Sequence, residues 1–595
     1  MRQHPGASCS ISGGVEGALV VGLDRQRQLE LLLGGLYPGQ SSNEIKSLSS
    51  HLLQSECLGA QTHTQSQRPW SSATCVLICY ADSVIETDRT SLPLLRELLN
   101  GPLLALSSIV HVLPFWRSTS DGGFAISSHE ELEPRFGDWK DLEALSHGRL
   151  LMADLVLNHV SASHPWVHQC LQDRAPGSSC ILQASPDVCW SDVVRPRSSP
   201  LISSLAGRSG SKQVWTTFGP DQVDLNWQEP EVLRHFNRLM QRLFRHGVGW
   251  LRLDAVGYVW KERFTSCIHR PQAHAIVQVL RLLQEAHAPG GAVVTETNVP
   301  EAENLSYLRS GREAHLAYNF PLPPLLLEAS QSERCDLLNR WLAGWPELPE
   351  GTNLLNFSAS HDGVGLRPLE GLMDQPRLLQ LLAGCEQRGG LISHRRLSDG
   401  TEVPYEINIS WWSAMADPGR DSRRWQRERF LLSQRFKLAL PGVPAFYLPA
   451  LLAAPNDTAR FQASGHRRDL NRPQFNAQAL QLQLQDPGQD ASLNVAQLQY
   501  AMEQRANLPA LDPDAPMRVI SAGRSDVVIL ERGQENARLW AIHNFTATRQ
   551  SLVLASLWGA TSPRGWIDHL NPAGTVRTER QLELEPFGVY WISSR

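Results

Sequence analysis

Eight short apolar runs between residues 73 and 448 constrain the fold more than any other feature of this 595-residue chain. Each run is rich in β-branched or aliphatic residues, and amphipathic stretches separate the runs, a pattern typical of parallel strands buried by helices on both faces. The runs are 73–82, 106–116, 149–159, 247–256, 291–297, 314–320, 353–362 and 439–448. The pattern predicts an α/β fold, a (β/α)8 TIM barrel, whose chemistry would lie at the carboxyl ends of the strands.

Two connections are too long for simple loops, one after the third run and one after the seventh. Insertions of this length in barrels usually form lids or small domains beside the site. After the barrel, short alternating strands broken by Gly, Pro and polar turns predict an antiparallel β domain. We therefore divide the chain into an N-terminal helical extension, a catalytic barrel with two insertions, and a C-terminal β domain. The expected ranges are 1–72, 73–510 with a B domain at about 160–228 and an acceptor-loop or lid region at about 363–430, and 515–595.

Charge and cysteine content exclude several classes of partner. The chain carries 55 Lys plus Arg against 60 Asp plus Glu, a net charge of −5, so it has no overall basic field for nucleic acid or an anionic membrane. Its ten cysteines form no C-x-x-C pair and no zinc-spaced quartet. The start does not resemble a signal peptide, and no run reaches the roughly 18 apolar residues of a membrane span. We expect a cytoplasmic monomer or homodimer with no metal, no cofactor and no nucleic-acid or membrane partner.

Three acidic residues end barrel runs. Asp254, Glu296 and Asp362 close the fourth, fifth and seventh runs, so a closed barrel would direct all three into one mouth. Such a cluster suits either a divalent metal or glycoside chemistry, in which one carboxylate attacks and a second donates a proton. Arg252 precedes Asp254 by two residues on the same strand face, and we expect its charge to lower the pKa of Asp254.

Each such residue taken singly is more often a loop cap or a structural ion pair. Their joint occurrence at several strand ends favours a functional site. Two histidines at strand ends, His159 and His361, are suited to donating hydrogen bonds to sugar hydroxyls.

Four segments resemble the signature regions of the α-amylase superfamily, glycoside hydrolase family 13. They are DLVLNH (154–159), WLRLDAVGY (250–258), VVTETNV (293–299) and FSASHD (357–362). The resemblance implies that Asp254 is the nucleophile, Glu296 the general acid/base and Asp362 the transition-state stabiliser. It also implies that three further residues hold the glucosyl unit: His159, Arg252 and His361.

Other segments are similar to the branch that contains sucrose phosphorylase and glucosylglycerate phosphorylase, among them LPFWRSTSDGGF (113–124), PYEINIS (404–410) and RRDLNR (467–472). This resemblance implies that Asp121 and Arg472 clamp the distal hydroxyls and close the pocket behind one glucose. It further implies a retaining phosphorylase that moves glucose from a small α-glucoside to inorganic phosphate through a covalent glucosyl-enzyme, giving α-glucose 1-phosphate. The alternatives are a hydrolase or transglucosylase of the same superfamily and a non-catalytic sugar-binding barrel.

The second insertion carries the candidate contacts for phosphate and for the acceptor. We expect the cationic run His394, Arg395 and Arg396 to bind phosphate or an anionic acceptor, although such a run is as often a solvated surface. The PYEIN segment supplies the candidate acceptor contacts Tyr405, Glu406 and Asn408. The PYEIN form resembles that of branch members acting on glucosylglycerate, glucosylglycerol or sucrose 6′-phosphate. This resemblance favours glucosylglycerate as substrate, with sucrose next. Two tryptophans follow it, Trp411 and Trp412, and we expect them to reshape the acceptor pocket.

Overall fold

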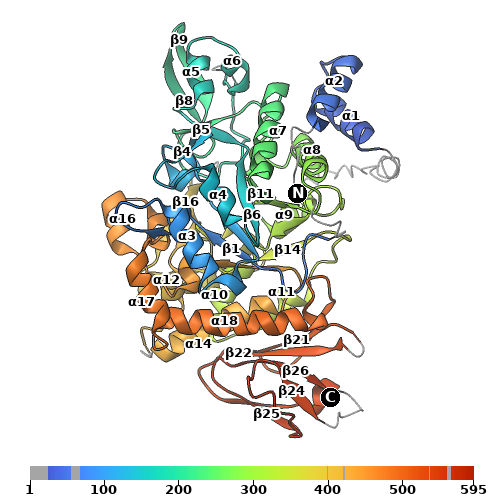
Figure 1. Ribbon diagram of the computed structural model, residues 1–595, viewed down its shortest axis with the longest axis vertical. Coiled ribbons are helices and arrows are strands. Elements are labelled where there is room, and N and C mark those ends of the chain that lie inside the picture. The colour runs from blue at the N-terminus through green and yellow to red at the C-terminus, as the bar shows by residue number, and fades with distance from the viewer. Residues whose placement is uncertain are drawn as a thin grey trace, which may run out of the picture.

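The computed structural model describes residues 24–54, 68–185, 188–397, 400–419, 423–534, 537–558 and 565–594. Eight parallel strands close a barrel at its centre, in the order β1-β18-β14-β13-β12-β11-β6-β3 (Figure 1). Each strand falls inside one of the eight predicted runs, so the predicted (β/α)8 barrel is confirmed. The strands are β1 (Val76–Cys79), β3 (Ile109–Val112), β6 (Leu150–Val156), β11 (Val248–Asp254), β12 (Ala292–Thr295), β13 (Leu316–Tyr318), β14 (Asn353–Asn356) and β18 (Val443–Tyr447).

Helices bury the outer face of the barrel. Two of them, α7 (Pro230–Arg245) and α8 (Pro271–His287), flank β11 in the chain, and each begins with proline in its first turn, where no intrahelical hydrogen bond is lost. Their apolar stripes, which include Phe236 and Leu280, are fully buried. β11 between them is buried at every residue, so its polar side chains lie inside the barrel.

The first insertion lies between β6 and α7. It contains β7 (His159–Ser161), α5 (Pro165–Leu171), α6 (Gly177–Cys180), β8 (Ile202–Gly207), β9 (Gly210–Trp215) and β10 (Gln222–Asp224). β10 pairs with β7 in antiparallel fashion, which places Asp224 opposite His159 at the barrel mouth. The β8–β9 hairpin projects from the end of the molecule opposite the C-terminal β domain (Figure 1).

The second insertion contributes a small sheet of order β15-β17-β16. Its central strand is β17 (Glu402–Asn408), flanked by β15 (Val364–Gly365) and by β16 (Leu391–Arg396). The helices α12 (Gln375–Gln387), α13 (Trp411–Ala414) and α14 (Arg423–Leu438) complete the insertion. Trp411 and Trp412 are buried in α13, where the Trp411 indole donates to Ser433 Oγ on α14. Both belong to the protein core, and Trp411 also lines a cavity beside Asp362 and Gly363.

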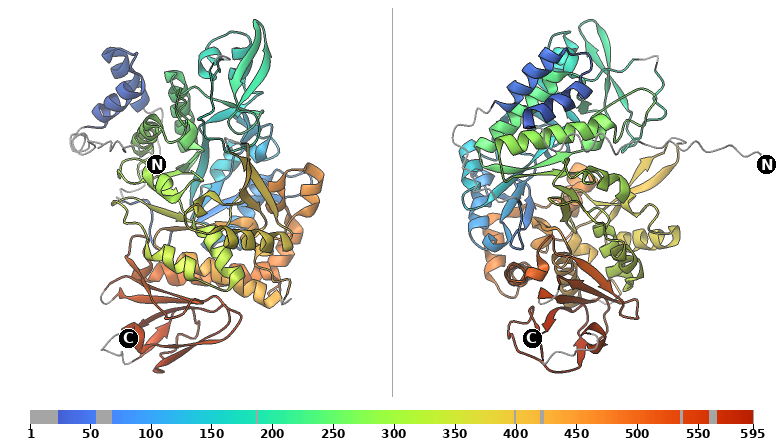
Figure 2. Two further views of the ribbon diagram at one scale, coloured as in Figure 1. Left: turned by 180° about the vertical axis from the view of Figure 1, so that it is seen from behind. Right: turned by 90° about the vertical axis from the view of Figure 1, so that its right-hand side faces the viewer.

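A helical hairpin near the N-terminus lies against the outside of the barrel. It consists of α1 (Arg25–Leu36) and α2 (Ser42–Leu53) and covers α8 (Figure 2). Leu29, Leu33 and Leu52 are fully buried in this contact. At its end, Asn237 Nδ2 and His287 Nε2 donate to the Leu52 carbonyl oxygen at 3.1 and 2.9 Å.

The C-terminal unit is antiparallel, as predicted. Its main sheet has the order β20-β21-β22-β26-β24 and a β23-β25 ribbon accompanies it. The helix α18 (Asp490–Asn507) runs between this unit and the barrel (Figure 1). The strands are β20 (Met517–Ile520), β21 (Val527–Arg532), β22 (Leu539–Asn544), β23 (Gln550–Val553), β24 (Trp566–Asp568), β25 (Gln581–Leu584) and β26 (Val589–Ser594).

Within the described ranges, no helix combines the length and apolarity that crossing a membrane requires. The same residues contain eight cysteines, all of them free thiols, and no group of three or more His, Cys, Asp or Glu that could hold a metal ion.

Candidate active site

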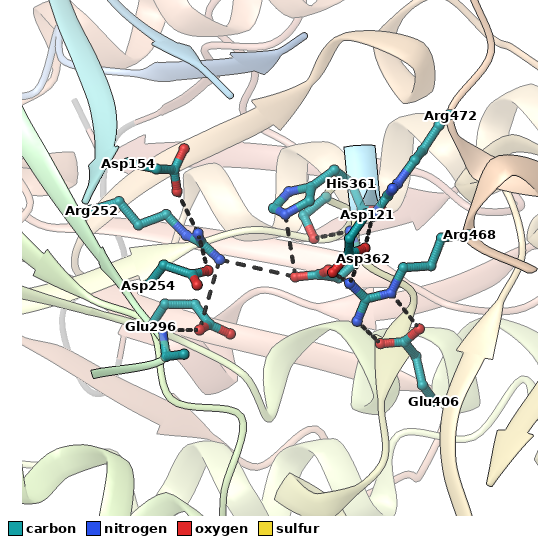
Figure 3. A network of polar contacts seen from close by, with 12 residues as sticks. Asp121, Asp154, Arg252, Asp254, Glu296, His361, Asp362, Glu406, Arg468 and Arg472 are labelled. Carbon is teal, nitrogen blue, oxygen red and sulfur yellow. Dashed lines mark hydrogen bonds and ion pairs between the residues drawn. The ribbon is translucent and has the colours of Figure 1, made fainter. Parts of the chain in front are cut away.

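One buried arginine organises four carboxylates at the mouth of the barrel. Arg252 Nη1 donates to Asp254 Oδ1 at 2.8 Å and to Asp154 Oδ1 at 2.5 Å (Figure 3). Its Nη2 lies 3.8 Å from Glu296 Oε2 and 4.0 Å from Asp362 Oδ2. The alternation of side chains along β11 brings residues 252 and 254 to one face, as the sequence spacing predicts. Strand ends far apart in the chain therefore deliver their acids to a single point.

Burial changes the acidity of the two central acids. The pKa of Asp254 lies well above its usual value because burial outweighs the lowering by Arg252, and the charge of Glu296 raises it further. Arg252 lowers the pKa of Asp254, as expected, but burial has the larger and opposite effect. Burial also raises the pKa of Glu296. Neighbouring carboxylates of this kind titrate as a pair, and the hydrogen bond from Arg252 to Asp254 favours the shared proton on Glu296.

Asp154, which we did not single out from the sequence, accepts a hydrogen bond from Arg252 and holds it in place. His111 Nε2 donates to its second oxygen at 2.7 Å, and the carboxylate is fully buried. Burial would raise the pKa of Asp154, but His111 and Arg252 together lower it to about 2. Asp154 is the first residue of the DLVLNH segment. It lies two residues before Val156 on β6, so the two side chains share one face of the strand, and this could have indicated that Asp154 points into the barrel.

Glu296 is held by the turn that follows β11. The Ala255 N–H donates to Glu296 Oε2 at 3.2 Å. Ala255 has φ of +51°, a conformation that a residue with a Cβ rarely adopts, so the surrounding structure forces the chain to turn directly after Asp254.

Three of the predicted sugar-binding residues, Asp121, His159 and His361, line the same pocket, and Arg472 lines a neighbouring one. The His361 ring stacks on Phe124 with centroids 4.9 Å apart and planes 6° apart. Gln222 Nε2 donates to His159 Nε2 at 3.1 Å and to Asp121 Oδ2 at 3.2 Å. Burial lowers the pKa of His159 to about 4, so its ring is neutral near pH 7.

Asp121 and Arg472 meet at the far wall of the pocket. Asp121 Oδ1 lies 3.9 Å from Arg472 Nη2, and Arg472 Nε donates to the His361 carbonyl oxygen at 2.8 Å. Gly122 lies between them with φ of +59°, and a Cβ there would be 2.5 Å from Arg472 Nη1 and 2.8 Å from the Tyr80 hydroxyl. Only glycine fits this turn without displacing the wall.

The candidate acceptor residues of β17 divide into two groups. Tyr405 and Glu406 line the pocket. Asn408 lies behind them: its Nδ2 donates to Glu406 Oε1 at 2.7 Å, and its Oδ1 accepts from Ser393 Oγ at 2.7 Å. Asn408 therefore orients Glu406 from outside the pocket.

The two described side chains of the cationic run on β16 are not among the residues that line the pocket. His394 is exposed, and Arg395 Nη2 donates to Glu370 Oε1 at 2.9 Å instead. The side chain of Arg396 lies outside the described residues. β16 is the edge strand of its sheet, and β17 separates it from β15, so the pocket is approached by β17.

Two other arginines supply positive charge to the acceptor side. The Arg197 guanidinium, from the first insertion, lies 5.5 Å from the centre of the Tyr405 ring. Arg468, on the 3-10 helix η6 (Arg467–Asn471), lies between Asp362 and Glu406 (Figure 3). Both line the pocket. We missed them because Arg-Pro-Arg at 195–197 and RRDLNR each contain several arginines, and no periodicity tells which one faces inward.

The sequence of this chain is similar to the sequences of known proteins. The family described as "Alpha amylase, catalytic domain" matches residues 106–362. Glucosylglycerate phosphorylase of Allomeiothermus silvanus is 38% identical over 479 residues, which cover 80% of this chain and 86% of the relative. Glucosylglycerate phosphorylase of Escherichia coli is 32% identical over 570 residues, covering 95% of this chain and 98% of the relative.

Among solved structures, sucrose 6F-phosphate phosphorylase from Thermoanaerobacter thermosaccharolyticum aligns with a TM-score of 0.70 and 22% identity. The alignment covers 86% of this chain and 98% of that structure, and it is a likeness of fold.

Proposed function

The chain belongs to the α-amylase superfamily, glycoside hydrolase family 13, in its sucrose phosphorylase and glucosylglycerate phosphorylase branch, and from this premise we propose that it is a retaining α-glucoside phosphorylase. It transfers glucose from a small α-glucoside to inorganic phosphate and releases α-glucose 1-phosphate. The observation that carries the proposal is the buried cluster of Asp254, Glu296 and Asp362 around Arg252, in a pocket that Arg197 also lines.

In the first step Glu296 donates its proton to the departing oxygen while Asp254 attacks the anomeric carbon. Burial raises the pKa of Glu296, which is the direction that a proton donor requires. The hydrogen bond from Arg252 keeps an Asp254 oxygen in place for attack. The carboxylate of Asp362 is suited to stabilise the positive charge that develops on the sugar ring in the transition state.

In the second step phosphate enters on the acceptor side and Glu296 accepts its proton. Phosphate competes with water at about 55 M, so the subsite must concentrate an anion. Arg197 is suited to this task because a guanidinium binds phosphate and carboxylate oxygens in bidentate fashion. Two inversions at the same carbon retain the α configuration.

The wall of Asp121, Gly122 and Arg472 explains why the substrate is a small glucoside. It closes the pocket on the side away from the scissile bond, so the site holds one glucosyl unit at its non-reducing end. Exo action on one terminal glucose follows from that closure.

Glycerate is the acceptor that we propose, with the sucrose acceptor fructose second. Two relatives that span most of this chain are named glucosylglycerate phosphorylase. The guanidinium of Arg197 can bind each anion in turn, because glycerate leaves the pocket before phosphate enters.

The test is an acceptor screen in the direction of synthesis. The enzyme is supplied with α-glucose 1-phosphate and, separately, D-glycerate, fructose, fructose 6-phosphate and glycerol, and phosphate release is measured. We expect the highest kcat/KM with D-glycerate. Release of free glucose at the same rate with and without phosphate would instead identify a hydrolase.

A further inference from the structure

Arg468 joins the donor and acceptor halves of the pocket through two carboxylates. Its Nη1 lies 2.5 Å from Asp362 Oδ1. Its Nη2 and Nε donate to the two oxygens of Glu406 at 2.8 and 3.1 Å, a bidentate pair (Figure 3). A third carboxylate, that of Asp121, lies 3.9 Å away. Only 17% of the Arg468 side chain is exposed, so solvent does little to screen these contacts.

Without Arg468, the buried charge of Glu406 would oppose the binding of an anionic acceptor. Its side chain is 2% exposed and lines the side of the pocket that receives the acceptor. An uncompensated carboxylate there would repel phosphate and glycerate, because like charges in a poorly solvated pocket interact strongly. Asn408 contributes a hydrogen bond to Glu406 but no charge.

Arg468 and Arg197 together compensate the charge of Glu406, with Arg468 the larger contributor. Burial would raise the pKa of Glu406, but Arg468 lowers it below its usual value, so the carboxylate remains ionised and paired. Each of its oxygens receives one bond from Arg468, and Oε2 has one lone pair left for an acceptor hydroxyl.

We propose that Arg468 is a positioning residue that sets acceptor specificity: it cancels the charge of Glu406 so that the acceptor subsite admits anions, while Glu406 still hydrogen-bonds acceptor hydroxyls. This inference rests on the proposed phosphorylase function. It predicts that the loss of Arg468 discriminates between charged and neutral acceptors, which mere support of the Asp362 loop would not do.

The experiment uses α-glucosyl fluoride as a common donor with phosphate, D-glycerate or glycerol as acceptor. Four variants are compared: R468Q, E406Q, the double variant, and R467Q as a matched control one residue earlier, where the side chain is exposed. In R468Q we expect KM to rise by about tenfold or more for phosphate and glycerate but by less than about threefold for glycerol. kcat falls for all acceptors, because Asp362 loses its partner.

The double variant, which combines R468Q with E406Q, distinguishes charge compensation from structural support of Asp362. Removing the Glu406 charge in the R468Q background should return KM for phosphate to within about threefold of wild type, a coupling that a double-mutant cycle measures directly. E406Q alone removes one negative charge from the acceptor side while Arg468 stays paired with Asp362, so its KM for phosphate should fall. R467Q should match wild type.

Equal rises in KM for glycerol and phosphate in R468Q, without rescue by E406Q, would show that Arg468 only supports Asp362 and would overturn the inference. If R468Q does not fold, E406Q alone decides: a KM for phosphate that rises as much as that for glycerol overturns it. A wild-type enzyme that transfers glucose from the fluoride to water but not to phosphate refutes the proposed function itself.

Discussion

Substitution of Asp154 by asparagine tests whether the charge beneath Arg252 stabilises the folded protein. The lowering of its pKa from 3.8 to about 2 corresponds to about 2.4 kcal/mol of folding free energy at neutral pH, at about 1.36 kcal/mol for each pH unit. The folded-state pKa is the lower one, so this contribution is present above about pH 4 and is lost as the pH falls through about 2. At pH 3 about 1.3 kcal/mol remains.

Urea unfolding followed by tryptophan fluorescence measures the difference. D154N should lose about 2.4 kcal/mol relative to wild type at pH 7 and about 1.3 kcal/mol at pH 3. D88N, at an exposed position, should match wild type at both pH values. kcat should fall as well, because Arg252 loses one of the two carboxylates to which it donates hydrogen bonds and no longer holds Asp254 firmly in place. An equal loss of stability at both pH values would refute the assignment of the effect to charge.

Three further substitutions test other parts of the structure. D254A should abolish turnover while the thermal unfolding profile is retained, and substantial residual activity would contradict its role as nucleophile. G122A should raise KM for the donor by about tenfold or more, because the new methyl group displaces Arg472 from the pocket wall; unchanged kinetics would show that the wall adapts. Burial raises the pKa of Asp568 to about 6, so its contribution to stability is lost as the pH rises through 6. D568N should therefore be more stable than wild type by about 3 kcal/mol at pH 8 and by only about 0.6 kcal/mol at pH 4 in urea unfolding, and a less stable variant at pH 8 would rule this out.

The barrel could be predicted from the sequence because strands buried on both faces must be apolar throughout. β11 shows the limit of that rule: Arg252 and Asp254 interrupt an otherwise apolar strand, and they do so because they neutralise each other inside the barrel. These two charged residues weaken the apolar pattern that predicts the strand, and the same two residues indicate where the site lies.

The acceptor side was less predictable for a physical reason. His394 and Arg395 occupy an edge strand, and the orientation of an edge strand depends on pairing that the sequence does not reveal. Arg468 is 62 residues from Glu406 in the chain, and only the closed barrel brings η6 beside β17. Burial is also a property of the folded state, so the sequence could identify Arg252 as a partner of Asp254 without showing that burial dominates the pKa.

The helical hairpin on the outside of the barrel has a consequence for the order of events during synthesis. Its partner surface includes Asn237 and His287, which bind the Leu52 carbonyl oxygen. A ribosome adds about 5 to 20 residues per second, so α1 and α2 emerge roughly 10 to 50 s before His287 exists. During that interval the surface of α8 that covers Leu29, Leu33 and Leu52 in the folded protein does not yet exist. A nascent chain arrested before residue 271 should therefore expose an apolar hairpin that chaperones can bind, and one extended beyond α8 should not.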